Sequence, residues 1–168
     1  MSQRQRIVAV YPGTFDPLTL GHEDILKRAA GMFDELVLAV AVAHHKRTMF
    51  SLDERLALAA EVTAPLGNVR VDSYRGLLRD YCLARGVRVV VRGVRAATDF
   101  DYEFQMAGMN RHLMPGVDTI FLTPQAQTQF ISSTFVREIA TLGGDVAALV
   151  SPSVLKRLQE RVAQAREA

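Results

Sequence analysis

The sequence predicts an α/β fold, a single domain built on a five-stranded parallel sheet with helices on both faces. Two observations lead to this prediction. Short apolar, β-branched runs alternate with helical patterns along almost the whole chain, and runs such as residues 7–11 and 36–43 are continuously apolar instead of alternating with polar residues. Continuous apolar strands are typical of a parallel sheet that helices cover on both sides. A chain of 168 residues is long enough to bury the core of one such domain.

The apolar runs are the expected strands, and they span residues 7–11, 36–43, 69–72, 87–91 and 119–122. The helical patterns that follow them cover residues 21–33, 52–64, 76–85, 99–113, 132–142 and 152–165. Start signals support two of these helices. Ser51 and Glu54 have the spacing of a capping box, and Ser151 is a capping residue placed before Pro152 at the first helical position. Gly31 lies near the end of the first helix, whose stop is less sharply marked.

Composition and charge exclude several classes of protein. The longest apolar runs, such as residues 36–43, are too short to cross a bilayer, and residues 1–6 lack the apolar segment of a secretion signal. Acidic and basic residues are interspersed, the net charge is only +2, and aromatic residues make up 7% of the chain. That balance gives poor support for a nucleic-acid surface. We expect a cytoplasmic protein with neither a membrane nor a nucleic acid as its partner.

The cysteine and histidine content argues against a metal centre built by the protein. The single cysteine, Cys82, allows no internal disulfide and fits a reducing compartment. It falls in an expected helix, where a buried structural thiol is favoured over a nucleophile. His44 and His45 are adjacent in an extended segment, so their side chains point apart. No zinc-type spacing is present, and any metal is expected to be Mg²⁺ that enters with phosphates.

The most informative segment is residues 12–22, between the first strand and the first helix. A turn rich in glycine and proline that leads into a helix N-terminus offers free backbone N–H groups and the helix dipole to a phosphate. The pattern is neither a P-loop nor Gly-x-Gly-x-x-Gly. Instead, Thr14 and a Thr-x-Gly-His run ending at His22 stand where a triphosphate would lie. The alternative is a plain turn with an exposed histidine.

Basic and hydroxyl side chains follow the other strands, and parallel strands bring such segments to one edge of the sheet. Lys46 follows the second strand, and Arg92 and Arg95 flank a glycine after the fourth. Arginine offers a planar fork to phosphate oxygens, and lysine a compact charge. After the fifth strand, Ser132, Ser133 and Thr134 open a helix, with Arg137 one turn later. Capping needs only one of these hydroxyls, so we expect both a cap and a second phosphate cradle.

These residues suit transfer between two phosphate-bearing reactants without a covalent intermediate on the protein. No Ser-His-Asp arrangement and no credible cysteine nucleophile is visible. One histidine, one lysine, two arginines and several hydroxyls can instead align the reactants and neutralise the charge that develops at phosphorus.

Two signatures, residues 19–22 (Thr-Leu-Gly-His) and 131–134 (Ile-Ser-Ser-Thr), resemble the paired motifs of the nucleotidylyltransferase superfamily. Residues 11–17, 46–50, 92–96 and 109–115 further resemble the bacterial phosphopantetheine adenylyltransferase family, in the expected order over about residues 7–155. The resemblance implies one Rossmann-like nucleotidylyltransferase domain over residues 1–168 and a homohexameric assembly. It implies reversible adenylyl transfer from ATP, with Mg²⁺, to 4′-phosphopantetheine. The products are dephospho-coenzyme A and pyrophosphate, in a late step of coenzyme A biosynthesis.

The same resemblance implies roles for individual residues. Those carried over to the catalytic step are Thr14, His22, Lys46 and Arg92. Those carried over to the acceptor are Thr14, Lys46, Leu78 and Arg92. Those carried over to ATP are Gly13, Thr14, Phe15, His22, Gly93, Val94, Arg95, Glu103, Thr128, Gln129, Phe130, Ile131, Ser132, Ser133 and Thr134. No residue is assigned to a metal.

Two other functions remain open at this point. Another nucleotidylyltransferase, acting on nicotinate mononucleotide or glycerol phosphate, would share the nucleotide site and differ in its acceptor loops. A non-catalytic nucleotide-binding regulator is the alternative of a different class. The combination of His22, Lys46 and Arg92 argues against the regulator, because a protein that only binds a nucleotide needs no such cluster.

Overall fold

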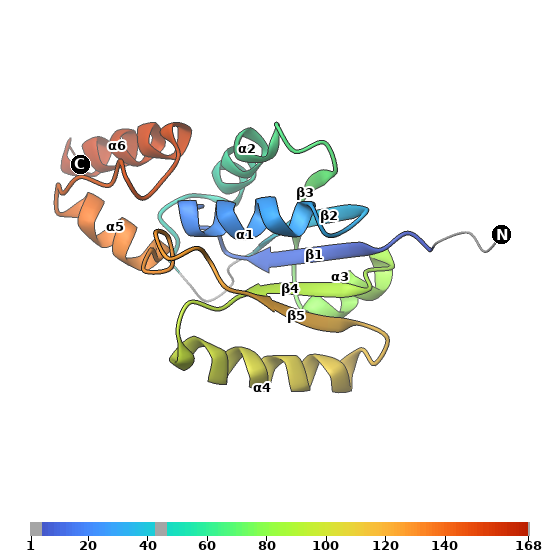
Figure 1. Cartoon of the computed structure of the whole chain (residues 1–168). Helices are drawn as coiled ribbons and strands as arrows, with labels where there is room; N and C mark the ends of the chain where they lie inside the picture. Colours follow the sequence, from blue (N-terminus) through green and yellow to red (C-terminus); the bar gives the residue numbers. More distant parts are fainter. Residues whose placement is uncertain (1–4, 43–46, 168) are drawn as a thin grey trace.

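Five parallel strands form the central sheet in the order β3-β2-β1-β4-β5 in this computed structural model, which describes residues 5–42 and 47–167 (Figure 1). The strands are β1 (Val8–Gly13), β2 (Glu35–Ala41), β3 (Val69–Tyr74), β4 (Val89–Gly93) and β5 (Asp118–Leu122). The helices are α1 (Leu20–Ala30), α2 (Leu52–Thr63), α3 (Leu78–Arg85), α4 (Ala97–Leu113), α5 (Ser133–Thr141) and α6 (Pro152–Glu167). The predicted α/β fold with five parallel strands is confirmed.

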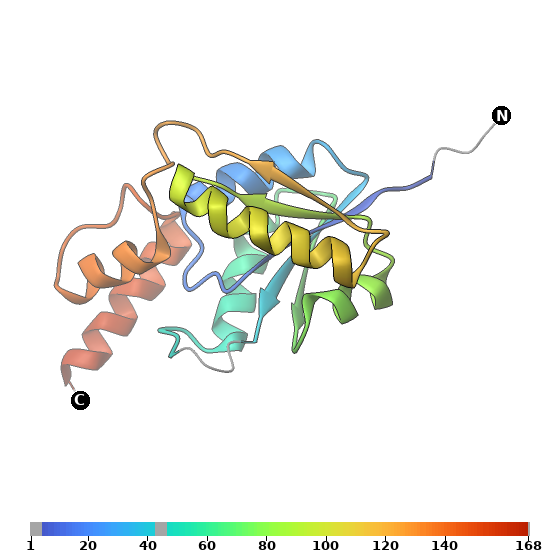
Figure 2. The same ribbon diagram turned by 90° about the horizontal axis from the view of Figure 1, so that it is seen from below.

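Helices cover both faces of the sheet. Helices α1 and α2 lie on one face, and α3 and α4 lie on the other, as the two views show (Figures 1 and 2). Successive strand residues point to opposite faces, so Leu36 and Leu38 join the core under α1 and α2, whereas Val37 and Ala39 join a second core cluster with Cys82. Because both faces of the sheet are buried at β1 and β2, these central strands are nearly continuous apolar runs, which is the pattern that the sequence contains.

Helices α5 and α6 lie beyond the carboxyl ends of the strands (Figure 1). Val136 and Ala140 of α5, and Val154 and Leu158 of α6, belong to the same core cluster as α1 and α2. The C-terminal helix, expected at residues 152–165, is therefore part of the main core and continues two residues further than expected.

Of the two predicted N-cap side chains, Ser51 caps its helix and Ser151 does not. The capping box of α2 is confirmed, because Ser51 Oγ accepts from Glu54 N and the Glu54 carboxylate accepts from Ser51 N at 2.7 Å. Helix α6 begins at Pro152 as predicted, but the hydroxyl of Ser151 is buried and has no hydrogen-bond partner in the described part of the chain. Only the Ser151 carbonyl contributes to the helix start, accepting from Leu155 N at 2.9 Å. The prediction of a side-chain cap at Ser151 is thus wrong.

Cys82 is a structural residue, as predicted. It lies in α3 and packs against the strands in the second core cluster. Burial raises the pKa of its thiol to about 11, so the thiolate that a nucleophile requires does not form near neutral pH. In the described ranges, no helix combines the length and apolar character needed to span a membrane.

We predict that α6 unfolds together with the sheet. Leu158 is 0% exposed, whereas Leu142 after α5 is 79% exposed. Leu158→Ala should therefore lower the free energy of unfolding by about 2–5 kcal/mol through the cavity it leaves, and Leu142→Ala should change it by less than about 0.5 kcal/mol. Urea unfolding followed by circular dichroism and by fluorescence measures both, and separate transitions for the two probes would contradict one cooperative domain.

Candidate active site

A cleft with a volume of about 500 Å³ opens at the carboxyl edge of the sheet. Its walls come from the end of β1, the start of α1, the end of β4, the start of α4 and the segment that begins α5. Strands β2 and β3 extend the sheet on one side of β1, and β4 and β5 extend it on the other side. The cleft thus lies where the order of strands reverses, which is the usual place for a ligand in an open parallel sheet.

The cleft brings together most of the residues that the sequence singles out. Those that line it are Gly13, Thr14, Phe15, His22, Arg92, Gly93, Arg95, Glu103, Ile131, Ser132, Ser133 and Thr134. Val94 is buried, and Leu78 packs at the start of α3 against the second core cluster, so neither is part of the lining. Thr128, Gln129 and Phe130 lie in the segment just before Ile131, also outside the lining. Lys46, with His44 and His45, lies outside the described residues.

The turn after β1 is shaped by the ring of Phe15. This ring packs edge-on against the rings of Tyr11 and His22, with centroid distances of 5.3 and 5.2 Å. A Cβ atom at Gly13 would lie 2.7 Å from the Phe15 ring, so a glycine is required at this position. Phe15 itself has a φ of 49°, in the left-handed region that residues other than glycine seldom adopt. Such a conformation persists only where the surroundings hold it, which is common at functional sites.

The Thr-x-Gly-His run forms the first turn of α1 as a capping box. Thr19 is the N-cap, and the side chain of His22 returns to it: Nδ1 accepts from Thr19 N at 3.1 Å. A Cβ atom at Gly21 would lie 3.1 Å from the Thr128 carbonyl, so the glycine lets this turn approach the segment before α5. His22 is partly buried in the cleft wall, which argues against the alternative of a plain turn with an exposed histidine.

The hydrogen bonds and burial of His22 determine its charge and its tautomer. Because Nδ1 accepts a backbone N–H, the neutral ring carries its proton on Nε2. Burial lowers the pKa of His22 to about 4, and the positive charges of Arg95 and Arg92 act in the same direction. At neutral pH the side chain is therefore an uncharged imidazole with one N–H group left to donate. It can donate a hydrogen bond to an anion, and the Thr19 N–H orients the ring without a carboxylate partner.

Arg92 and Glu103 form an ion pair in the cleft wall that the sequence did not reveal. The carboxylate accepts from Arg92 Nε at 2.7 Å and from Nη2 at 2.6 Å, while Nη1 donates to the Pro12 carbonyl at 3.0 Å. Burial by itself would lower the pKa of Arg92, but the hydrogen bonds and charge of Glu103 outweigh it and raise the pKa. Glu103, which the family resemblance assigns to ATP, thus lines the cleft with its carboxylate already paired.

Four further hydrogen bonds order the part of the cleft wall formed by Arg95 and the start of α5. Arg95 donates through Nε to Asp99 at 3.1 Å and through Nη1 to the Ile131 carbonyl at 3.2 Å, which ties the start of α4 to the segment before α5. Ser132 is the N-cap of α5 and accepts from Phe135 N at 3.1 Å. Ser133 Oγ donates to the Pro17 carbonyl at 2.8 Å. The expectation that one hydroxyl caps the helix is confirmed.

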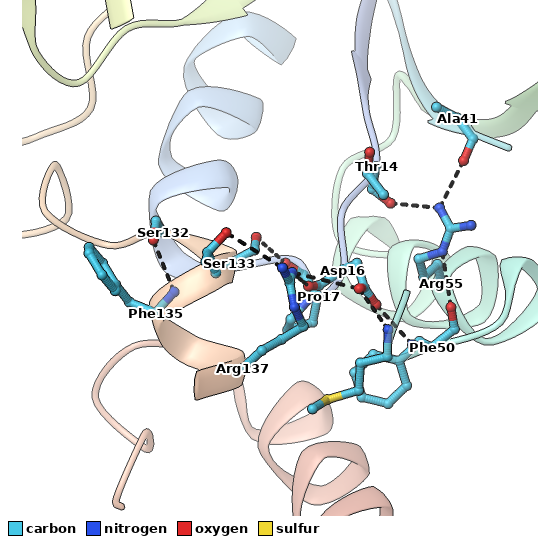
Figure 3. A network of polar contacts seen from close by, with 12 residues as sticks. Thr14, Asp16, Pro17, Ala41, Phe50, Arg55, Ser132, Ser133, Phe135 and Arg137 are labelled. Carbon is cyan, nitrogen blue, oxygen red and sulfur yellow. Dashed lines mark hydrogen bonds and ion pairs between the residues drawn. The ribbon is translucent and has the colours of Figure 1, made fainter. Parts of the chain in front are cut away.

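Asp16 is the residue that sequence reasoning missed, although it stands inside the predicted phosphate turn. Its buried carboxylate accepts from Met49 N at 2.8 Å and from Phe50 N at 2.9 Å, and Arg137 forms an ion pair with it at 3.6 Å (Figure 3). Arg137 also donates to the Asp16 carbonyl. The available signal was an acidic residue between Phe15 and Pro17, the only carboxylate in residues 12–22. Its partners come from segments 33 to 121 residues away, which the local pattern does not identify.

The lining is rich in cations, and its carboxylates are already engaged. Arg47, Arg92, Arg95 and Arg137 line the cleft together with three acids. Each of these acids has an arginine partner, at Asp16, Asp99 and Glu103. Within residues 5–42 and 47–167, no group of three or more histidine, cysteine or acidic side chains is placed to hold a metal.

Comparison with known proteins identifies the class of this chain. Residues 10–139 match the cytidylyltransferase-like family model, and the chain therefore belongs to that family of nucleotidyltransferases. The nicotinic acid mononucleotide adenylyltransferase of Plasmodium falciparum has the same fold, with a TM-score of 0.67 over 93% of this chain and 96% of that one, at 12% identity.

Two closer relatives narrow the family. A protein of Acidovorax sp. (strain JS42) is 60% identical over 156 residues, which cover 93% of this chain and 94% of the relative. A protein of Cupriavidus metallidurans is 59% identical over 159 residues, covering 95% and 99%. Both bear the name phosphopantetheine adenylyltransferase. Within the nucleotidyltransferases, the chain is thus a member of the phosphopantetheine adenylyltransferase family.

We predict that His22 of the ligand-free protein takes up a proton with a midpoint near pH 4, far below its usual 6.5. Between these two values the unfolded chain binds the proton and the folded protein does not, so stability should fall as the pH drops through this window. Titration of the histidine ring signals by NMR measures the midpoint, and His22→Gln identifies the signal by its loss. A midpoint near 6.5 would contradict the buried, neutral imidazole.

Proposed function

We propose that the protein transfers an adenylyl group from ATP to 4′-phosphopantetheine, giving dephospho-coenzyme A and pyrophosphate in a late and reversible step of coenzyme A biosynthesis. The proposal rests on the sequence similarity, over nearly the whole chain, to relatives that bear the name phosphopantetheine adenylyltransferase. The cleft supports it independently, since it combines an uncharged hydrogen-bond donor at His22 with four arginines in a space large enough for a nucleotide.

The two reactants are assigned to neighbouring parts of the cleft. We place ATP against the turn after β1, the end of β4, Glu103 and the start of α5. The residues of this proposal are Gly13, Thr14, Phe15, His22, Gly93, Val94, Arg95, Glu103, and 128–134. We place the acceptor against Thr14, Lys46, Leu78 and Arg92. The helix start at α5 supports the first assignment, because its backbone N–H groups and dipole favour an anion.

The chemistry we propose is direct attack of the acceptor phosphate on the α-phosphorus of ATP. The only cysteine is buried with a raised pKa, so it offers no covalent route. His22 would donate from Nε2 to an α-phosphate oxygen as negative charge builds there. Arg92 and Lys46 would draw the acceptor phosphate towards the anionic nucleotide and hold it in line. A bound Mg²⁺ supplies further neutralisation of the triphosphate charge.

Self-association as a homohexamer is part of the proposal. Helix α4 leaves several large apolar residues exposed: Phe100, Tyr102, Phe104, Met106 and Met109. Exposed apolar side chains in this number on one helix favour a protein interface. We also place the reaction in the cytoplasm, which is consistent with a single buried, unpaired cysteine.

Pyrophosphate release across a small acceptor panel tests the function. With ATP and magnesium, we expect release with 4′-phosphopantetheine and none with pantetheine, which lacks the attacking phosphate. Nicotinate mononucleotide and glycerol phosphate serve as the competing acceptors. Turnover of one of these in preference to 4′-phosphopantetheine would refute the proposal, and ATP binding without release for any acceptor would favour a nucleotide-binding regulator.

Replacement of His22 tests the donor role. His22→Ala should lower kcat by about 10²–10³-fold, which is the typical loss for one donor to a developing oxyanion. ATP affinity, measured by calorimetry, should change much less, because the hydrogen bond strengthens in the transition state. Thr19→Ala is the matched control, since it removes the cap side chain from the same helix turn and keeps the imidazole. A His22→Ala variant with the kcat of the wild type would make His22 a capping residue only.

A further inference from the structure

Arg55, in the first turns of α2, is the least exposed charged side chain of the described chain, with 2% of its surface accessible. No carboxylate in residues 5–42 or 47–167 lies within ion-pair distance of it. Burial lowers the pKa of its guanidinium, and the charge of Asp16 offsets part of this effect. A buried cation without an ion-pair partner is costly, and an apolar side chain of similar volume usually stabilises a fold better.

The guanidinium is satisfied by backbone carbonyls from three segments. Nη1 donates to Thr14 O at 2.8 Å and to Ala41 O at 2.9 Å, and Nε donates to Phe50 O at 3.3 Å (Figure 3). The last paired residues of β1 and β2 are Gly13 and Val40. Thr14 and Ala41 are thus the first residues beyond this ladder, and one nitrogen of Arg55 bridges the two carbonyls that follow the last pair.

Two of the three segments that Arg55 joins line the cleft, and Thr14 is one of the residues assigned to the acceptor. Thr14 lines the cleft directly, and the segment that ends at Phe50 contributes Arg47 and Thr48 to the lining. Asp16 binds the amides of this same segment, so Phe50 is held by its N–H through Asp16 and by its carbonyl through Arg55. The hydrogen bonds of Arg55 within the described residues reach neither the start of α5 nor the end of β4, and of its three partners only Thr14 is assigned to ATP as well as to the acceptor.

We propose that Arg55 is a positioning residue for the acceptor: it holds the end of β1, the end of β2 and the segment before α2 in the arrangement that the acceptor phosphate requires. This inference rests on the proposed function. Arg55 lies outside the cleft lining, so its effect on the acceptor passes through the backbone of the three segments.

Steady-state kinetics of Arg55→Met and Arg55→Lys tests the proposal. Loss of the bridging hydrogen bonds in Arg55→Met should raise the KM for 4′-phosphopantetheine about ten-fold or more. The Kd for ATP, by calorimetry, should stay within about two-fold of the wild type. Arg55→Lys keeps the charge and part of the hydrogen bonding, so its KM for 4′-phosphopantetheine should lie between those of the wild type and Arg55→Met. It also keeps the test decisive if Arg55→Met does not fold.

Asn68 provides a matched control at the opposite edge of the sheet. Its Nδ2 donates to Ala30 O at 2.8 Å and to Phe33 O at 3.1 Å, and thereby also joins backbone segments distant in sequence. Asn68→Ala should lower the melting temperature without changing the KM for the acceptor. A merely structural Arg55 would behave in the same way as Asn68.

The outcomes separate this inference from the proposed function. If wild-type protein releases no pyrophosphate with 4′-phosphopantetheine, the proposed function fails. If wild type is active and both Arg55 variants keep its acceptor KM, Arg55 is structural and the inference is overturned. Equal losses of ATP and acceptor affinity in Arg55→Lys would also overturn it. Arg55 would then support the binding of both reactants and not that of the acceptor alone.

Discussion

The geometry of the cleft depends on how the backbone is satisfied where the parallel strands stop. Beyond the last ladder pair, carbonyls and amides lose their strand partners, and burying them unpaired is costly. Here two side chains of opposite charge take over: Asp16 accepts from the amides of Met49 and Phe50, and Arg55 donates to the carbonyls of Thr14, Ala41 and Phe50. The turn after β1 is thereby joined to the segment before α2. Arg137 joins the same turn to α5 through Asp16.

A second consequence concerns charge. A site for two anionic reactants needs cations, but unpaired cations gathered in one cleft repel each other and prefer water. Arg92 is balanced by Glu103, Arg95 by Asp99 and Arg137 by Asp16, so the guanidinium groups are held in place before any ligand arrives. Such pre-organisation lowers the cost of ordering side chains on binding. His22 completes the arrangement without adding charge, because burial and the neighbouring arginines keep it neutral.

Several short motifs serve the fold and the site together. Thr19 and His22 build the capping box of α1, and the same hydrogen bond leaves the Nε2 proton of His22 available to a ligand. Gly13 is required by the ring of Phe15, which in turn packs on His22. Ser132 caps α5, and Ser133 binds the carbonyl of Pro17. Each of these residues therefore has a role in the local structure beside its place in the cleft.

The sequence by itself determined the parallel α/β fold, the elements and most of the cleft lining, because these depend on local signals. Continuous apolar runs mark buried strands, and residues after parallel strands meet at one edge. It did not reveal the pairing of Arg92 with Glu103, the role of Asp16 or the carbonyl contacts of Arg55. Those partners lie 5 to 121 residues apart in sequence, and no periodicity specifies them. Only the tertiary structure decided them, because hydrogen-bond partners in a buried site are chosen by which strand ends, turns and helices the core packs side by side.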